Sequence, residues 1–101
     1  MLKELTTIGF TEYEAKVYLA LLAENPANGY QVSKHSGVPR SMVYEALGRL
    51  EARGAVLKKE DRRATLYRPV PPDVLLDHYE EEHQRTLETL RTGLRSVYET
   101  Q

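Results

Sequence analysis

The sequence contains no cysteine, which excludes disulfide bonds and zinc sites built on thiolates. It also lacks an unbroken apolar run of roughly 18 residues, the length that indicates a membrane-spanning helix. Its N-terminus has no basic region followed by an apolar core, so a secretory signal is not supported. These absences agree with a reducing compartment, and we expect a cytoplasmic protein that does not associate with a membrane.

Sequence motifs of enzymes are missing as well. There is no glycine-rich phosphate loop, no nucleophile elbow and no histidine pair of the zinc proteases. His78 and Glu82 stand four residues apart, but two ligands do not form a metal site without a third. We therefore predict a protein that is not an enzyme, with no catalytic residue, no cofactor and no metal site.

Charge is distributed unevenly along the chain, although the net charge is only −1. Residues 29–70 carry nine basic and four acidic side chains, which gives +5, whereas residues 1–28 carry −2 and residues 71–101 carry −4. A polyanion would be attracted to the middle segment alone. An uneven but merely solvated surface is the alternative interpretation of this pattern.

The first half of the chain predicts helices. After a short turn over Leu2–Ile8, Thr11 and Glu14 form the signature of a capping box, which begins a helix that stops at Asn25-Pro26. Gly29 opens a second, shorter helix over Tyr30–His35.

The next helix is predicted from about Pro39 to Arg53, with Gly54 as its C′ residue. The segment Ser36-Gly37-Val38-Pro39 separates it from the preceding helix. Two helices joined by a turn of about four residues with a glycine are typical of a helix-turn-helix.

A β-hairpin is predicted directly after the helix-turn-helix. Ala55–Glu60 and Thr65–Val70 are short strand-like runs, and the polar turn Asp61–Ala64 lies between them. A hairpin in this position is a wing. Pro71-Pro72 then breaks the chain before the next element.

Residues 73–101 predict one long helix. It runs from Asp73, the predicted N-cap, to about Thr100, and Gly93 is tolerated at a cost of about 1 kcal/mol. From His83 on, the spacing alternates between four and three residues, as in a coiled-coil seam. Packing back onto the helix that begins at Thr11 is the alternative to dimerisation. The predicted dimer seam consists of Leu76, His83, Leu87, Leu90, Leu94 and Val97.

The helix over residues 39–53 carries the strongest candidates for DNA contact, because the second helix of a helix-turn-helix enters the major groove. Its apolar stripe, Val43, Ala46, Leu47 and Leu50, predicts a buried face, and the opposite face presents Arg40, Ser41, Tyr44, Glu45 and Gly48. Arg40 is the best candidate for guanine, and a cation at a helix N-terminus is explained if an anion binds there. A solvated Arg40 and a partly buried Tyr44 are the alternatives.

Basic residues outside this helix are candidates for contact with the DNA backbone. Arg62 and Arg63 lie in the predicted turn of the wing, where a short turn projects them toward phosphates or the minor groove. Lys34 belongs to the first helix of the helix-turn-helix and is a candidate for a backbone contact. Charged residues are also ordinary in hairpin turns, so position alone does not assign this role.

Three segments resemble one known family when they are taken together, in this order and at this spacing. They are TEYEAKVYLALL, SGVPRSMVYEALGRLEARG and YRPVPP, and the resemblance covers roughly residues 2–77. The segments are similar to the DNA-binding domain of TrmB-family transcriptional regulators. The resemblance implies that Gly29–Ser36 and Pro39–Arg53 form the helix-turn-helix, with Arg40, Ser41 and Tyr44 facing DNA. Larger members carry a C-terminal effector domain that binds sugars, whereas this sequence ends after one helix.

The expected fold is mainly α with a small β-hairpin (α+β), organised as a winged helix-turn-helix over residues 1–72 and a dimerisation helix over residues 73–101. The expected function is sequence-specific DNA binding by a homodimeric transcriptional regulator. Its predicted partners are double-stranded DNA and a second copy of the chain, and the sequence identifies no small-molecule effector. The alternative function is a winged-helix module that pairs with a different protein through its C-terminal helix.

Overall fold

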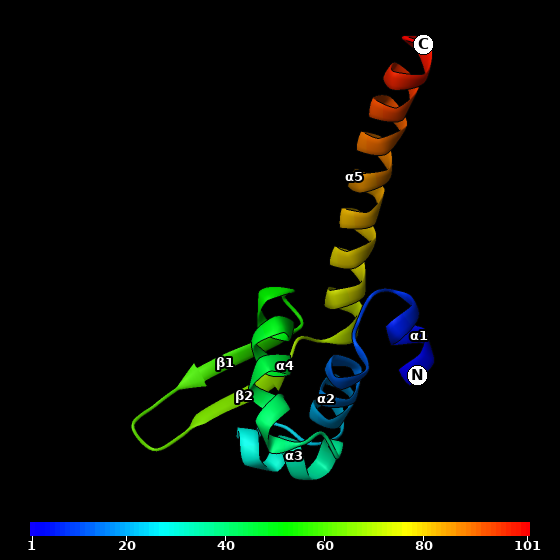
Figure 1. Cartoon of the computed structure of the whole chain (residues 1–101). Helices are drawn as coiled ribbons and strands as arrows, with labels where there is room; N and C mark the ends of the chain where they lie inside the picture. Colours follow the sequence, from blue (N-terminus) through cyan, green and yellow to red (C-terminus); the bar gives the residue numbers. More distant parts are fainter. The chain divides into compact units, whose positions relative to one another are not determined.

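A computed structural model describes all residues 1–101 of the chain. Its elements follow in the order α1 (Leu2–Thr7), α2 (Glu12–Ala23), α3 (Gly29–Ser36), α4 (Arg40–Ala52), β1 (Val56–Glu60), β2 (Thr65–Pro69) and α5 (Pro72–Glu99) (Figure 1). The protein is mainly helical with one hairpin, which confirms the predicted α+β class. No helix of the protein combines the length and the apolar composition that a membrane-spanning segment requires.

The chain divides into two compact units, Met1–Val70 and Pro71–Gln101. The first unit holds α1 to α4 and both strands, and the second holds α5. The predicted boundary, after residue 72, lies two residues further along the chain than the end of the first unit at Val70.

Two capping boxes fix the beginnings of α2 and α3. The backbone N–H of Glu14 donates to Thr11 Oγ1 at 3.1 Å, and the backbone N–H of Thr11 donates to Glu14 Oε1 at 2.7 Å, which confirms the predicted box. The backbone N–H of Gln31 donates to Asn28 Oδ1 at 2.8 Å, and that of Asn28 donates to Gln31 Oε1 at 2.9 Å. This second box, which was not predicted, begins α3 with two otherwise unsatisfied donors bonded.

The turn of the helix-turn-helix lies between α3 and α4. Gly37 ends α3 with φ at 74°, a left-handed conformation that glycine adopts at little cost. The Ser33 hydroxyl donates to the carbonyl oxygen of Val38 at 2.8 Å and closes the turn from the side of α3. Pro39 is then the N-cap of α4, which ends before Gly54 with φ at 79°. The predicted bounds of this helix are therefore correct to within one residue.

The two strands form an antiparallel hairpin in which Val56 pairs with Pro69 and Glu60 pairs with Thr65. Ala27, in the connection between α2 and α3, adds two backbone hydrogen bonds to Tyr67, of 3.1 and 2.8 Å. Strand β2 therefore has a hydrogen-bonded neighbour on each side, a feature that was not predicted. The tip of the hairpin extends beyond the helices of the unit (Figure 1).

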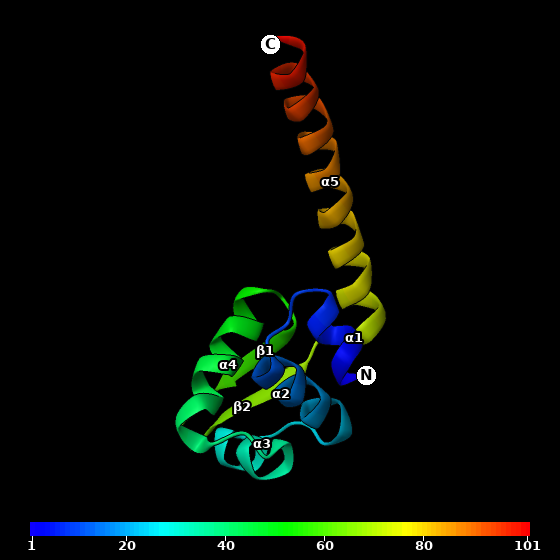
Figure 2. The same ribbon diagram turned by 45° about the vertical axis from the view of Figure 1, so that its right-hand side comes forward.

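The core of the first unit lies around α2, which packs against α1, α3, α4 and β2 (Figure 2). Its centre is apolar, because the largest fully buried side chains include Val17, Leu21, Val32, Leu47 and Leu50. The face of α4 predicted to be buried is buried in full. Truncation of one such leucine to alanine costs about 2–5 kcal/mol. Burial of these side chains therefore fixes the orientation of α4 about its own axis and thus which of its faces is exposed.

Helix α5 is one continuous helix from Pro72 to Glu99, with Leu75 as its one buried residue. Its beginning differs from the prediction: Pro71 is the N-cap and Pro72 the first helical residue, whereas Asp73 lies within the first turn. Proline is suited to the first helical position because its missing N–H would have no partner there. Asp73 still favours the helix, since a carboxylate near the N-terminus interacts well with the helix dipole.

Candidate nucleic-acid interface

The residues predicted to contact DNA lie at the surface of the protein. Burial of one face of α4 turns its opposite face toward solvent. From α4, the exposed candidates are Arg40, Ser41, Tyr44 and Glu45, and from α3 and the hairpin they are Lys34, Arg62 and Arg63. The structure therefore leaves all seven available to an external partner.

Arg40 is the first residue of α4, and its guanidinium lies over the ring of Tyr30, the second residue of α3. The Arg40 Cζ atom is 5.2 Å from the Tyr30 ring centroid, within the range of a cation–π contact. Tyr30 remains 53% exposed, and Arg40 forms no ion pair. Tyr30 was not predicted as part of the site, because only the packing of α3 against α4 brings the two residues together.

Tyr44, one turn after Arg40, lies against the beginning of α3. A Cβ atom added to Gly29 would be 2.5 Å from the Cε1, Cζ and Oη atoms of Tyr44, so the ring occupies the space that a side chain at Gly29 would need. Tyr44 is nevertheless 52% exposed. Tyr44 therefore packs against α3 and remains half exposed, and its contact with DNA stays a prediction.

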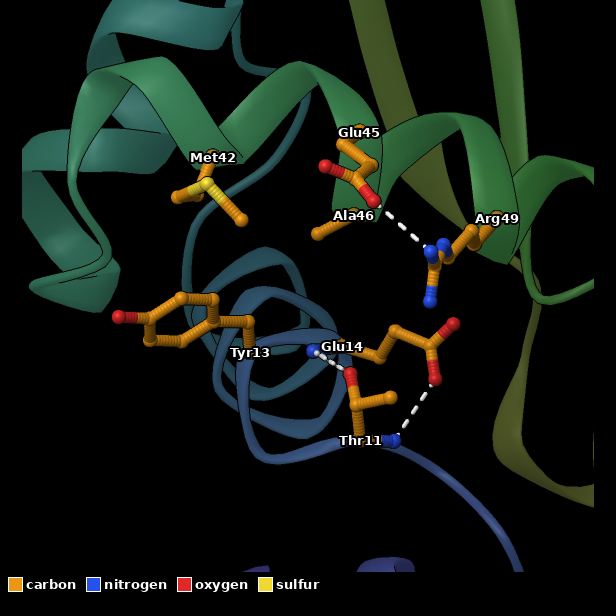
Figure 3. Close-up of a pocket in the computed structure, with 7 residues that line it drawn as sticks. All are labelled: Thr11, Tyr13, Glu14, Met42, Glu45, Ala46 and Arg49. Atoms are coloured by element: carbon orange, nitrogen blue, oxygen red, sulfur yellow. Dashed lines mark hydrogen bonds and ion pairs between the residues drawn. The ribbon is translucent and has the colours of Figure 1, made fainter.

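Glu45 engages an arginine of its own helix. Arg49 Nη2 donates to Glu45 Oε1 at 2.8 Å, an ion pair between residues four apart (Figure 3). The pair lies at a pocket of about 200 Å³ between the beginning of α2 and α4, lined by Thr11, Tyr13, Glu14, Met42, Glu45, Ala46 and Arg49. Glu45 thus keeps one carboxylate oxygen without a protein partner.

Glu14 and Arg53 stabilise the scaffold behind this surface. Glu14 is 2% exposed, and besides its place in the capping box it lies 3.6 Å from Arg53 Nη2. Arg53 also donates to the carbonyl oxygen of Gly9 at 2.8 Å, with its Cζ 4.8 Å from the Phe10 ring centroid. Because a buried carboxylate needs a partner, Arg53 serves the fold rather than an external ligand.

Asp61 shapes the turn at the tip of the hairpin. Its Oδ1 accepts hydrogen bonds from the backbone N–H groups of Arg63, at 2.8 Å, and Ala64, at 3.0 Å. These two bonds hold the pKa of the Asp61 carboxyl below its ordinary value. The turn therefore presents Arg62 and Arg63 from a hydrogen-bonded backbone, and the side chains of both arginines are exposed.

Ion pairs divide the basic residues of segment 29–70 into two groups. Three of them are paired: Arg49 with Glu45, Arg53 with Glu14, and Lys58 with Glu60 at 3.1 Å. The hydrogen bond that the Lys58 ammonium donates to the Glu60 carboxylate raises the pKa of Lys58. The other six have no carboxylate within ion-pair distance, and we call them the unpaired cations: Lys34, Arg40, Lys59, Arg62, Arg63 and Arg68.

The predicted seam residues of α5 form a second exposed feature. Leu76, Leu90, Leu94 and Val97 are 48%, 47%, 62% and 62% exposed, and Leu87 is 37% exposed. His83 is exposed on the same helix. No group of three or more histidine, cysteine, aspartate or glutamate side chains lies close enough together to hold a metal ion, so His78 and Glu82 gain no third ligand.

The order of elements, the helix-turn-helix and the hairpin that follows it define the class of the protein: it is a winged-helix domain of the kind found in transcriptional regulators. The sequence model of the family described as "Sugar-specific transcriptional regulator TrmB" matches residues 5–73. The chain belongs to the TrmB family, as its resemblance to that family predicts. The family and the fold are those of transcriptional regulators.

Two relatives illustrate how far the similarity extends. An uncharacterised protein of Bacillus subtilis, YrhO, is 50% identical over 76 residues, which cover 75% of this chain and 27% of that protein. The sugar-sensing transcriptional regulator TrmBL1 of Pyrococcus furiosus is 32% identical over 98 residues, which cover 97% of this chain and 28% of that protein. The chain therefore spans just over a quarter of the length of these relatives.

Solved structures agree with this assignment. The archaeal chromatin protein TrmBL2 superposes with a TM-score of 0.90 at 25% identity, over 98% of this chain and 38% of TrmBL2. A MarR-family transcriptional regulator from Silicibacter pomeroyi superposes with a TM-score of 0.62 at 21% identity, over 97% of this chain and 74% of that protein. The second likeness concerns the fold alone.

Proposed function

We propose that this protein is a sequence-specific, DNA-binding transcriptional regulator that acts as a homodimer in the cytoplasm. The observation that carries the proposal is the combination of an exposed face on α4 with the six unpaired cations of segment 29–70. A cation without a carboxylate partner has no protein carboxylate that competes with a phosphate for it, and its binding to DNA releases condensed counterions. Membership of the TrmB family supports the same role.

Helix α4 reads the bases in this proposal. Arg40, free of ion pairs, donates to the O6 and N7 acceptors of guanine from the N-terminal turn of the helix. Ser41 and Tyr44 follow on the exposed face and contact bases or phosphates. Glu45 has one carboxylate oxygen outside its ion pair with Arg49, an acceptor suited to the N4 amino group of cytosine.

The DNA backbone is bound by the cations around this helix. Arg62 and Arg63 extend from the tip of the wing to phosphates or the minor groove, and Lys34 of α3 contacts a phosphate. These contacts set the orientation of the protein and do not discriminate between sequences. Three such contacts in each protomer are six in a dimer, for which the logarithm of the binding constant falls with the logarithm of salt concentration at a slope of about −5.

Helix α5 joins the two protomers. Its exposed leucines and valine recur at coiled-coil spacing, and an exposed apolar stripe of this length is covered when two copies pair. A dimer places two copies of α4 in successive major grooves about 34 Å apart. The acidic charge of residues 71–101 keeps this helix apart from DNA.

Selection from random duplex DNA tests the proposal. Purified protein is mixed with a pool of random duplexes at two salt concentrations, and the bound fraction is sequenced. We expect a roughly palindromic site and an affinity that falls strongly as salt rises. Absence of enrichment, with weak binding even at low salt, would refute sequence-specific binding and favour a module that pairs with a different protein through α5, which sizing and cross-linking then test.

A further inference from the structure

We propose that Tyr30 is a specificity-determining residue that positions the Arg40 guanidinium for base reading, so that an aromatic residue of α3 directs the arginine of α4. This inference rests on the proposed DNA binding. It assigns a role to a residue for which neither the sequence pattern nor the predicted site provided one. The observation behind it is the placement of the Arg40 Cζ atom 5.2 Å from the Tyr30 ring centroid.

The ring of Tyr30 is held on a rigid support. Tyr30 is the second residue of α3, directly after the capping box in which Asn28 and Gln31 exchange two hydrogen bonds. The preceding residue, Gly29, is buried beneath Tyr44. Two independent contacts thus fix the backbone that carries the ring, so the ring can restrict the motion of a flexible arginine.

The contact with Tyr30 leaves the N–H groups of Arg40 free, because none of them donates to an acceptor in the protein. Recognition of guanine requires N–H groups at the edge of the guanidinium, directed at O6 and N7. Arg40 has no ion pair, whereas Arg49 and Arg53 donate their N–H groups to protein acceptors. The ring of Tyr30 therefore orients Arg40 without using the donors that a guanine needs.

The tyrosine hydroxyl offers a competing role. Tyr30 is 53% exposed, and the first helix of a helix-turn-helix crosses the DNA backbone, so its hydroxyl could donate to a phosphate. The two roles use different parts of the same side chain. Tyr30→Phe keeps the ring and removes the hydroxyl, whereas Tyr30→Ala removes both.

The test is selection from one random duplex pool with the full-length parent protein and with Tyr30→Ala, Tyr30→Phe, Arg40→Ala and the double variant Tyr30→Ala/Arg40→Ala. We expect Tyr30→Ala and Arg40→Ala to relax the preference at the same base pair, and Tyr30→Phe to retain it. On the parent's selected duplex, Tyr30→Ala should lower affinity roughly two- to fivefold, the size of an exposed cation–π contact. The double variant should bind no more weakly than Arg40→Ala.

Three outcomes would overturn the inference while leaving DNA binding intact. They are an unchanged preference in Tyr30→Ala, a Tyr30→Phe protein as weak as Tyr30→Ala on every duplex, and losses that multiply in the double variant. The second outcome assigns the hydroxyl to a phosphate. If the parent protein itself selects no site, the proposed function fails and this inference fails with it. Circular dichroism and thermal unfolding of each variant verify that the half-exposed positions have been changed without loss of fold.

Discussion

The contact between Gly29 and Tyr44 allows the stability of the fold to be separated from DNA binding. In Gly29→Ala, the new Cβ would lie 2.5 Å from three atoms at the far end of the Tyr44 side chain. An ordinary carbon contact needs about 3.5–4.0 Å, so the ring has to move by about 1 Å or more. Tyr44 is 52% exposed, and solvent provides the space for that movement.

Two energy terms of similar size oppose each other in this variant. Gly29 lies in α3 and its φ is not positive, so alanine fits the backbone and contributes up to about 1 kcal/mol of helix propensity. Displacing the Tyr44 ring from its rotamer costs about 0.5–1.5 kcal/mol. The free energy of unfolding should therefore change by less than about 1 kcal/mol, a shift in melting temperature of at most about 8 °C. Affinity for the selected duplex should fall by about 1–3 kcal/mol, because the Tyr44 hydroxyl leaves its place on the exposed face.

Urea unfolding followed by circular dichroism measures the first quantity, and fluorescence anisotropy on a labelled duplex measures the second. Gly93→Ala is the matched control, since nothing lies within 4 Å of its added Cβ and it belongs to α5. This control should gain about 0.5–1 kcal/mol of stability and keep its affinity for DNA. An unchanged affinity for DNA in Gly29→Ala would refute a role for Tyr44 in binding. A decrease of more than about 3 kcal/mol in the free energy of unfolding would show that the Tyr44 ring does not move aside for the added Cβ.

Three further predictions concern the α4 surface, the seam and the hairpin turn. Arg40→Ala should lose about 1–3 kcal/mol of binding energy and relax the preference at one base pair, whereas Arg63→Ala should weaken binding to all duplexes alike. Fluorescence anisotropy on matched and mismatched duplexes measures both effects, and the same pattern of losses in the two variants would contradict the prediction. Leu90→Asp should be a monomer in analytical ultracentrifugation, with an affinity for the operator that is lower by a factor of about 10² or more. Thr92→Asp, which lies off the seam, should remain a dimer, and a dimeric Leu90→Asp would mean that the dimer interface lies elsewhere. In NMR titration, the Asp61 carboxyl should have a pKa below its ordinary value of 3.8, because its hydrogen bonds to the turn stabilise the charged form. These hydrogen bonds are present above the ordinary pKa and are lost as the pH falls through the lowered pKa, so a titration midpoint at the ordinary value would show that they do not form.

Features encoded by a few adjacent residues could be predicted from the sequence. Thr11 and Glu14 are three residues apart, and their capping box depends on nothing beyond one helical turn. The left-handed Gly37 and the buried stripe of α4 follow from equally local rules. The N-cap of α5 lies two residues earlier than predicted, because the rule for an aspartate N-cap competed with the rule for proline at the first helical position, and proline prevailed.

Features that depend on the angle between helices could not be predicted. Arg53 meets the buried Glu14 only after α2 packs on α4, and Tyr30 meets Arg40 only after α3 does so. The hydrogen bonds between Ala27 and Tyr67 likewise join segments far apart in the chain. Periodicity describes which face of a helix is apolar and contains no information on which partner residue the neighbouring helix brings to it.

The pairing of charges distinguishes the scaffold from the candidate interface more sharply than composition does. The chain contains almost equal numbers of basic and acidic residues, so a count predicts no preference for a polyanion. Within segment 29–70, however, the carboxylates of Glu45 and Glu60 neutralise cations of their own helix or strand, and Glu14 neutralises Arg53. The two pairs with exposed carboxylates, Arg49 with Glu45 and Lys58 with Glu60, contribute little to stability, since the energy of an exposed ion pair is about 0–1 kcal/mol. What they change is the surface potential, because each carboxylate offsets the charge of one cation and leaves the six unpaired cations, Arg40 and the arginines of the wing among them, to attract an anion.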